Sequence, residues 1–319
     1  MKSNLTSLCI LVGVSLAAQG LAMVMPDYFT QLFMYGCINA ILAVSLNLVN
    51  GLSGQFSLGH AGFMGVGAYT AASVNVFLLS SFHGTPVGDQ TALILSLIAA
   101  ALVSALAGYL VGLPSLRLKG DYLAIATLGF GEIIRVIILN IQKVGGARGF
   151  IGIPPTTSAF LTVFVLASCV LLTHRFVQSS HGRSLLAVRE NEIAAESMGV
   201  NTTYFKVQTF VVSAGLAGVA GGLFAHYLSY INPSSFDFMK SVEIVIMVVL
   251  GGMGSVSGSI LAAFLLTLLP EVLRPLQDIT HVDLRMVIYS LALILMMLLR
   301  PKGLFGRKEL WELFKKKTT

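Results

Sequence analysis

The chain has 319 residues, of which 55% are hydrophobic and only 11% are charged. A soluble domain carries about a quarter charged residues, so this chain has too few to cover a water-facing surface, and most of its surface must face lipid. Its apolar runs are close to the roughly 20 residues that a helix needs to cross a bilayer, and about twice as long as a β-barrel strand. We therefore expect an all-α membrane protein, a polytopic bundle of transmembrane helices in the lipid bilayer.

The net charge of +6 is distributed unevenly, with basic residues gathered in the ranges 117–119, 175–206 and 300–317. Short loops rich in Lys and Arg face the cytoplasm, so these segments indicate the inner side of a membrane and not a nucleic-acid surface. The three cysteines have neither disulfide nor metal-ligand spacing, and no metal site is expected.

Ten apolar runs follow one another along the chain: 5–24, 29–49, 58–79, 91–113, 122–141, 160–172, 205–230, 242–250, 259–269 and 286–299. The first is too long for the apolar part of a signal peptide, which is usually about 7–15 residues. Ten crossings with the N-terminus inside place both termini and all three basic segments in the cytoplasm. Because 242–250 alone is too short to span, eight or nine crossings also fit, and we expect about ten within a range of 8–10.

Two segments that lie 200 residues apart share the pattern Gly-x-x-Gly-x-x-Ser, and each interrupts an apolar run. Transporters often contain internal repeats whose broken helices line the solute site near the middle of the membrane. We therefore expect a broken helix at each segment. The candidates for the translocation path are Gly51, Gly54, Gln55, Ser57, His60, Gly251, Gly254 and Ser257.

The alternative explanation of the glycines is close helix packing. Small residues four positions apart let two helices approach each other, and the chain has such pairs at Gly108/Gly112, Gly218/Gly222 and Gly254/Gly258. Packing is the simpler interpretation for most glycines, whereas the polar residues around 51–60 favour a role in transport. His60 has no carboxylate beside it in sequence, so a hydrogen-bonded structural histidine is the simpler interpretation there as well.

Glu132 and Arg135 are ionisable residues within an apolar run. Charged groups are costly in lipid, so both should face protein or water, where a functional role is the default hypothesis. Their spacing of three residues also allows them to pair on one helix face, so a structural ion pair stays open beside solute binding.

The longest polar stretch, 176–204, contains a segment from Gly182 to Gly199 with apolar and basic residues at helical spacing. We expect one short amphipathic helix there, suited to a partner's groove or to the membrane surface. Within it, Glu192-x-Ala194-Ala195-x-x-x-Gly199 resembles the coupling loop of ABC-importer permeases.

Further motifs resemble the LivM-type permeases of branched-chain amino acid ABC importers. They occur in the ranges 57–63, 118–124, 127–135, 191–195, 249–255 and 300–304. The resemblance covers about residues 30–306. It implies an ABC permease domain over 1–306 with a cytoplasmic coupling loop at 176–204, followed by a basic cytoplasmic tail at 307–319.

The resemblance also implies partners and a location. These are a homologous second permease subunit, two ATPase subunits and a periplasmic or lipid-anchored solute-binding protein, in the cytoplasmic (inner) membrane of a bacterium. The residues that would couple to the ATPases are Gly182, Arg189, Glu192, Ala194, Ala195 and Gly199. The solute would be Leu, Ile, Val or a similar amino acid.

The sequence has no Gly-x-x-x-x-Gly-Lys-Ser/Thr stretch, so ATP would be bound by the partner ATPases, and we expect neither a cofactor in this chain nor enzymatic activity. Three alternatives remain at this point. Urea or short amides could replace the amino acid as solute. An ion-coupled secondary transporter would use His60, Glu132 and Arg135, and an intramembrane enzyme or scaffold would move no solute.

Overall fold

The computed structural model describes residues 2–82, 84–116, 118 and 120–274, together with residues 290, 291, 294, 298 and 303–306. Several predictions therefore fall wholly or largely outside the described residues: the basic residues Arg117 and Lys119, the apolar run 286–299, the basic range 300–317 and the tail 307–319.

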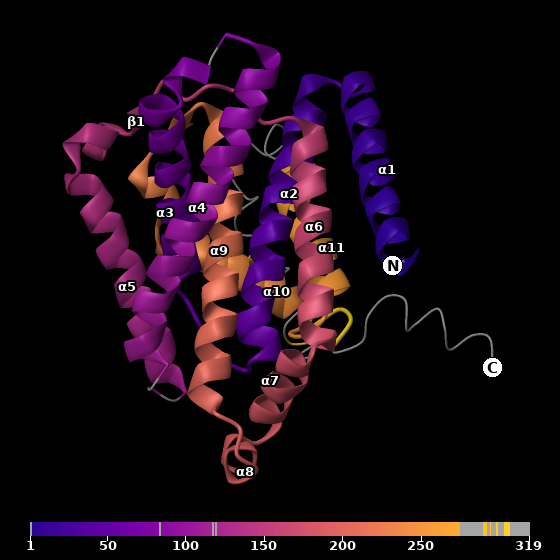
Figure 1. Cartoon of the computed structure of the whole chain (residues 1–319), viewed down its shortest axis with the longest axis vertical. Coiled ribbons are helices and arrows are strands. Elements are labelled where there is room, and N and C mark those ends of the chain that lie inside the picture. Colours follow the sequence, from indigo (N-terminus) through magenta and orange to yellow (C-terminus); the bar gives the residue numbers. More distant parts are fainter. Residues whose placement is uncertain are drawn as a thin grey trace.

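Nine apolar runs each form a helix within the part of the chain that the structure describes (Figure 1). These helices are α1 (Lys2–Val24), α2 (Asp27–Asn47), α3 (His60–Ser73), α4 (Pro86–Ser115), α5 (Asp121–Asn140), α6 (Ala159–Gln178), α9 (Thr202–Leu228), α10 (Phe238–Gly251) and α11 (Val256–Val272). Two π-helical turns, η1 (Leu48–Leu52) and η2 (Val74–Leu78), extend α2 and α3. The short helices α7 (Ser180–Glu190) and α8 (Glu192–Ser197) lie between α6 and α9.

Polar residues fix where many of these helices begin. The side chains of Thr85, Ser158, Asn201, Asp237 and Ser255 each accept a hydrogen bond from a backbone amide in the first turn of α4, α6, α9, α10 and α11. Such a cap satisfies a donor that the helix itself cannot, and is typically worth about 1 kcal/mol. The helix starts are therefore encoded locally, although the interior of each helix is apolar.

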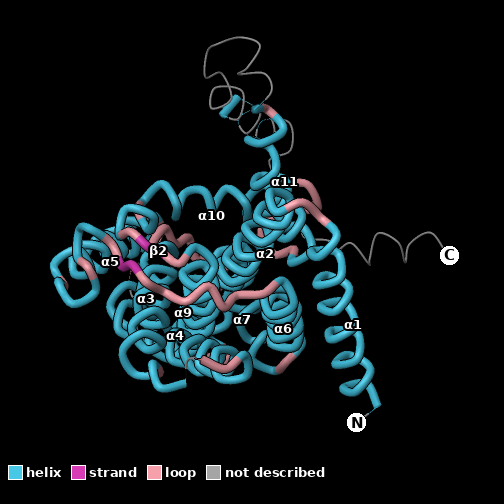
Figure 2. The backbone as a smooth tube through the Cα atoms, turned by 90° about the horizontal axis from the view of Figure 1, so that it is seen from above, coloured by secondary structure: helices cyan, strands magenta, loops and turns pink. Residues whose placement is uncertain are grey.

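The centre of the bundle is formed by α9 with α3 and α4 on one side and α2 on another (Figure 2). Glycines let these helices approach closely. A Cβ atom on Gly67 of α3 would lie 2.2 Å from the Cα of Gly218 on α9, and one on Gly221 would lie 2.0 Å from the carbonyl oxygen of Met64. The predicted packing role of the Gly218/Gly222 pair is confirmed, because Gly222 also lies against a neighbouring side chain, that of Leu97.

Six of the described helices are long and apolar enough to cross a membrane. These helices differ in how much of them is buried. Of the most apolar stretch, 83% is buried inside the protein in α2, but only 22% in α5 and in α6. The exposed face of α6 and the apolar helix α1 beside it lie at the outer edge of the bundle (Figure 2). An apolar outer face belongs in lipid, so the expected all-α membrane bundle is confirmed. The number of crossings stays a prediction.

Helices α7 and α8 form one end of the molecule, and a two-stranded ribbon lies at the opposite end (Figure 1). In the ribbon, β1 (Phe150–Ile151) pairs antiparallel with β2 (Tyr230–Ile231), which is followed by a 3-10 turn, η6 (Pro233–Phe236). The predicted cytoplasmic loop, 176–204, thus lies at the opposite end of the bundle from the ribbon (Figure 1).

Candidate functional site

The two glycine-rich segments lie against each other. A Cβ atom on Gly51 would stand 2.3 Å from the backbone nitrogen of Gly254, so only glycine fits at this contact. The fully buried side chain of Asn47 joins the segments: its Oδ1 accepts a hydrogen bond from the Gly254 amide at 2.8 Å, and its Nδ2 donates to the Ser255 carbonyl at 3.0 Å. Gly251 packs directly on Gly258 at the start of α11.

The polar residues of the first segment are buried and bonded within it. The Ser57 amide donates to Asn50 Oδ1 at 3.2 Å, and the Ser53 hydroxyl donates to Gln55 Oε1 at 3.3 Å. In the second segment, the hydroxyls of Ser257 and Ser255 lie 3.4 Å apart. Two hollows lie in the described part of the structure, one lined by Arg135 and one by Glu132, and none of the polar residues just named lines either of them. Their role in a translocation path therefore stays a prediction.

His60 is the first residue of α3 and is 2% exposed. Its Nε2 lies 2.7 Å from the Ser45 hydroxyl, and the carbonyl oxygen of Ser45 accepts a hydrogen bond from Ser213 of α9. The imidazole thus joins the start of α3 to α2, and no carboxylate of the described residues is bonded to it. This arrangement is typical of a structural histidine.

The predicted single amphipathic helix from Gly182 to Gly199 is wrong: α7 and α8 are separate helices that meet at Asn191. The backbone of Asn191 is extended, with φ −158° and ψ 107°, and its side chain accepts a hydrogen bond from the Ala194 amide at 3.0 Å. Asn is a strong N-cap because its short side chain competes for backbone donors, and here that local preference prevails over the helical periodicity.

The break at Asn191 divides the segment into an inner and an outer part. Arg189 on α7 is largely buried, whereas Ile193 and Met198 in and after α8 are 74% and 84% exposed. Gly199 ends α8 with a positive φ of 83°. The exposed apolar residues of α8 are available to a partner, and Arg189 is not.

Arg189 connects α7 to the glycine-rich segments. Its Nη1 donates to the Gly51 carbonyl at 2.9 Å, and its aliphatic part lies so close to Gly54 that a Cβ there would come within 2.8 Å of Cγ. Gly254 adjoins the same guanidinium. The structure therefore brings together residues that the sequence analysis assigned to two different sites: the coupling loop and the translocation path.

Helix α8 has its own connection to the bundle. Lys206 at the start of α9, 10% exposed, forms an ion pair with Glu192 at 2.7 Å, and Thr202 donates a hydrogen bond to Glu196, also at 2.7 Å. Ala195 is buried. The sequence analysis missed Lys206, although its place in a strongly basic polar loop next to an apolar run was a usable signal. Gly182, another predicted coupling residue, sits against the last carbonyls of α6.

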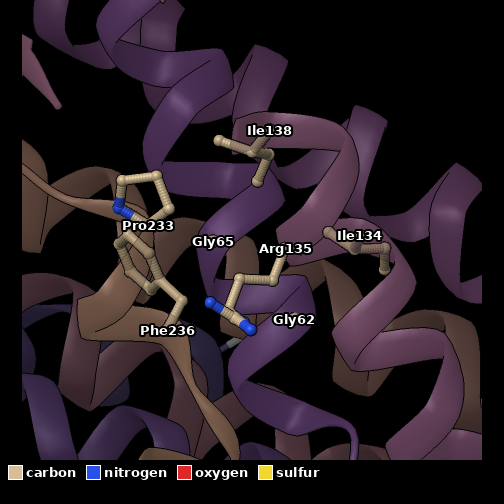
Figure 3. Close-up of a pocket in the computed structure, with 7 residues that line it drawn as sticks. All are labelled: Gly62, Gly65, Ile134, Arg135, Ile138, Pro233 and Phe236. Carbon is tan, nitrogen blue, oxygen red and sulfur yellow. The ribbon is translucent and has the colours of Figure 1, made fainter. Parts of the chain in front are cut away.

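The predicted intramembrane pair is formed: Arg135 Nε donates to Glu132 Oε2 at 2.8 Å. Both residues lie in the middle of α5, which runs from Asp121 to Asn140. The pair is partly exposed, 28% for Arg135 and 36% for Glu132. Arg135 lines a hollow between α5, α3 and η6 (Figure 3).

A second pair at membrane depth was missed by the sequence analysis. Lys240 of α10 bonds to Glu243 at 3.0 Å and to Asn39 at 3.1 Å, and Asn39 in turn donates to Thr267 of α11. Asn39 is halfway along the candidate span Asp27–Leu52, so the start of α10 lies level with the middle of that helix. The spacing of Lys240 and Glu243, three residues apart where the apolar run 242–250 begins, was the signal that could have identified this pair.

Comparisons with known proteins agree with these features. The family described as branched-chain amino acid transport system / permease component matches residues 28–299. The chain is 39% identical to the high-affinity branched-chain amino acid transport system permease protein LivM of Salmonella typhimurium, over 84% of this chain and 67% of that protein. It is 38% identical to LivM of Escherichia coli over the same shares.

A more distant relative is the permease protein LivH of Escherichia coli, which is 27% identical over 88% of this chain and 84% of that protein. No solved structure matches the chain. The resemblance inferred from the sequence motifs is confirmed. The chain belongs to the family of permease components of branched-chain amino acid transport systems.

Proposed function

We propose that this chain is the transmembrane permease subunit of an ATP-driven importer that moves Leu, Ile, Val or a similar amino acid across the bacterial cytoplasmic membrane. The family match over residues 28–299 and the printed names of the relatives support the solute class. The apolar bundle supports a multi-pass position in the membrane. In this role the chain has no enzymatic activity and no cofactor of its own.

The proposal includes partner subunits. ATP is bound and hydrolysed by two ATPase subunits, which contact α7 and α8 from the cytoplasm. A homologous second permease subunit completes the membrane part, and the similarity of this chain to both LivM and LivH supports such a pairing of related subunits. A periplasmic or lipid-anchored binding protein delivers the solute at the end that carries β1 and β2. Both termini are cytoplasmic.

The contact of Arg189 with Gly51 is the observation that carries the proposal. Exposed apolar residues on α8 offer a docking surface, and Arg189 on the adjoining α7 reaches the place where α2 and α10 leave helical structure. A movement of α7 and α8 by an ATPase would therefore act directly on the glycine-rich segments. Alternating access needs such a bistable element, whose two states a partner can bias.

The test is uptake of labelled leucine by proteoliposomes that contain this chain and its operon partners, with labelled urea in parallel. We expect leucine uptake that requires ATP and is lost when the ATPase subunits carry a disabled nucleotide site. Glu192→Ala should reduce uptake as well, because it removes the ion pair that holds α8 to α9. Urea uptake alone would overturn the solute, and flux without the ATPase subunits would overturn the importer.

A further inference from the structure

The position and the exposure of the pair formed by Glu132 and Arg135 suit a binding site as well as a structural ion pair. Along α5, at 1.5 Å per residue, Glu132 lies about 16 Å and Arg135 about 21 Å from Asp121, so both lie within the apolar length of the helix. Charged groups at this depth must face protein or water. Yet about a third of each side chain is exposed, so the pair is not sealed inside the bundle.

Each member of the pair lines a hollow, and the two hollows adjoin. Arg135 lines one hollow and Glu132 lines the other, and neither has room for more than about one water molecule in this structure. Both hollows share Gly62 of α3 and Phe236 of η6. A positive and a negative group therefore lie side by side, each next to one of two neighbouring hollows.

The wall of the first hollow is apolar. Ile134, Ile138, Pro233 and Phe236 surround Arg135, and the guanidinium points between Phe236 and Gly62 (Figure 3). Glycine on α3 lets this wall pack closely: a Cβ on Gly65 would lie 3.2 Å from Cγ of Phe236. An aliphatic side chain would find a matching surface here.

Arg135 retains unused donors. Within the described residues, Nε alone makes a hydrogen bond, to Glu132, which leaves the two terminal nitrogens facing the hollow. Lys240, a second cation among the described helices, already has two oxygen partners, from Glu243 and Asn39. A guanidinium with two free nitrogens is suited to hold a carboxylate through two parallel hydrogen bonds.

We propose that Arg135 binds the carboxylate of the amino-acid solute, that Glu132 binds its ammonium group, and that Ile134, Ile138 and Phe236 contact its aliphatic side chain. This proposal rests on the proposed function and specifies its solute site. The hollows as they stand have no room for an amino acid, so binding requires that α5 and η6 move apart, a change of the kind that alternating access needs.

The test measures binding of labelled leucine to the assembled transporter in lipid nanodiscs without the solute-binding protein. The competitors are unlabelled leucine and leucinamide, whose carboxylate is replaced by an uncharged amide. For the unmodified chain we expect leucinamide to compete at least tenfold more weakly. In Arg135→Gln, leucine affinity should fall about 10- to 100-fold, the range expected for hydrogen bonds to a charged group, and the preference over leucinamide should disappear.

Three further variants separate binding from folding. Arg135→Lys keeps the charge without the paired donors, so it should bind leucine with intermediate affinity and retain part of the preference. Gly65→Ala pushes Phe236 into the hollow and should weaken leucine and leucinamide equally. Arg148→Gln, an exposed arginine at the end with the ribbon, is the control and should change neither value.

The outcomes distinguish this site from the proposed function. If the unmodified transporter imports leucine with ATP but the Gln and Lys variants keep full affinity and preference, the site is wrong and the function stands. Absence of leucine binding in the nanodiscs would likewise overturn the site. If urea and not leucine is imported, the proposed solute is wrong and the site is overturned with it.

Discussion

The segments 51–57 and 251–257 share a glycine pattern but take different shapes. The first leaves α2 through the π-helical turn η1 and runs without helical structure until α3 begins at His60. The second is a short turn between Gly251, where α10 ends, and Val256, where α11 begins. A shared pattern thus marks two places where the backbone leaves the helix, while neighbouring residues determine the shape that follows.

The difference arises from where each segment finds its hydrogen-bond partners. The first has hydrogen bonds of its own, such as the bond from the Ser57 amide to Asn50, and takes one from outside, from Arg189 to the Gly51 carbonyl. The second depends on Asn47, a residue of α2, for both a donor and an acceptor. Because unpaired polar backbone is costly in a membrane, the second segment should be stable only in contact with the first.

The largest effect is expected at the contact between the segments. In Gly51→Ala the added Cβ would lie 2.0 Å from Asn47 Oδ1 and 2.3 Å from the Gly254 nitrogen, and backbone must move to admit it. We expect a loss of more than about 3 kcal/mol of stability, at the upper end for overpacking. The measurement is thermal stability of the purified chain in detergent, followed by loss of the monodisperse chromatographic peak.

The matched control is Gly13→Ala in α1, because no heavy atom lies within 4 Å of a Cβ at that position. Ala is the better helix former by about 1 kcal/mol, so the control should be neutral or slightly stabilising. Equal stability of the two variants would show that the two segments do not depend on close contact.

The next largest loss of stability is expected when Asn47 is replaced, and Asn50 provides the comparison. Asn47→Leu removes two hydrogen bonds and leaves the Gly254 amide without its partner, while the Ser255 carbonyl keeps its bonds from Ser259, and it should cost about 2 kcal/mol. Asn50→Leu removes a single bond, to the Ser57 amide at 3.2 Å, and should cost about 1 kcal/mol. The same melting measurement decides, and a larger loss for Asn50→Leu would reverse the assignment of Asn47 as the link.

Arg189→Gln should affect stability less, by about 1 kcal/mol for its bond to the Gly51 carbonyl, but should uncouple transport. We expect ATP hydrolysis to continue while leucine uptake per ATP falls about tenfold, because α7 no longer pulls on the glycine-rich segments. Arg183→Gln is the control, since Arg183 lies exposed on the same helix and bonds only near the end of α6 among the described residues. A parallel fall of uptake and hydrolysis would indicate loss of folding and not of coupling.

The sequence was sufficient for the features that local chemistry encodes. The apolar runs predicted the membrane helices, and glycine pairs such as Gly218/Gly222 predicted close packing. Glu132 and Arg135 were predicted as a pair because i and i+3 are neighbours on any helix. Each of these inferences needs only the spacing of residues within one element.

The features that the sequence did not reveal depend on contacts between distant residues. The link from Asn47 to Gly254 joins positions 207 apart, and nothing in either segment's composition names its partner. The helical periodicity of 182–199 concealed the break at Asn191, because the pattern of apolar residues continues across it. Arg189 consequently appeared to face a partner protein, whereas the break turns it towards Gly51.

The smallest effect on stability and transport is expected from the second connection between the coupling loop and the bundle, the ion pair between Glu192 and Lys206. Lys206 is 10% exposed and Glu192 is 30% exposed, so solvent weakens the pair, and a double-mutant cycle with Glu192→Gln and Lys206→Met should give a coupling energy of about 0.5–1 kcal/mol. The pair holds α8 to α9 and does not touch the glycine-rich segments. Lys206→Met should therefore reduce leucine uptake per ATP less than Arg189→Gln does. If it reduced uptake per ATP more, α9 and not the glycine-rich segments would be the main route by which the coupling loop acts on the bundle.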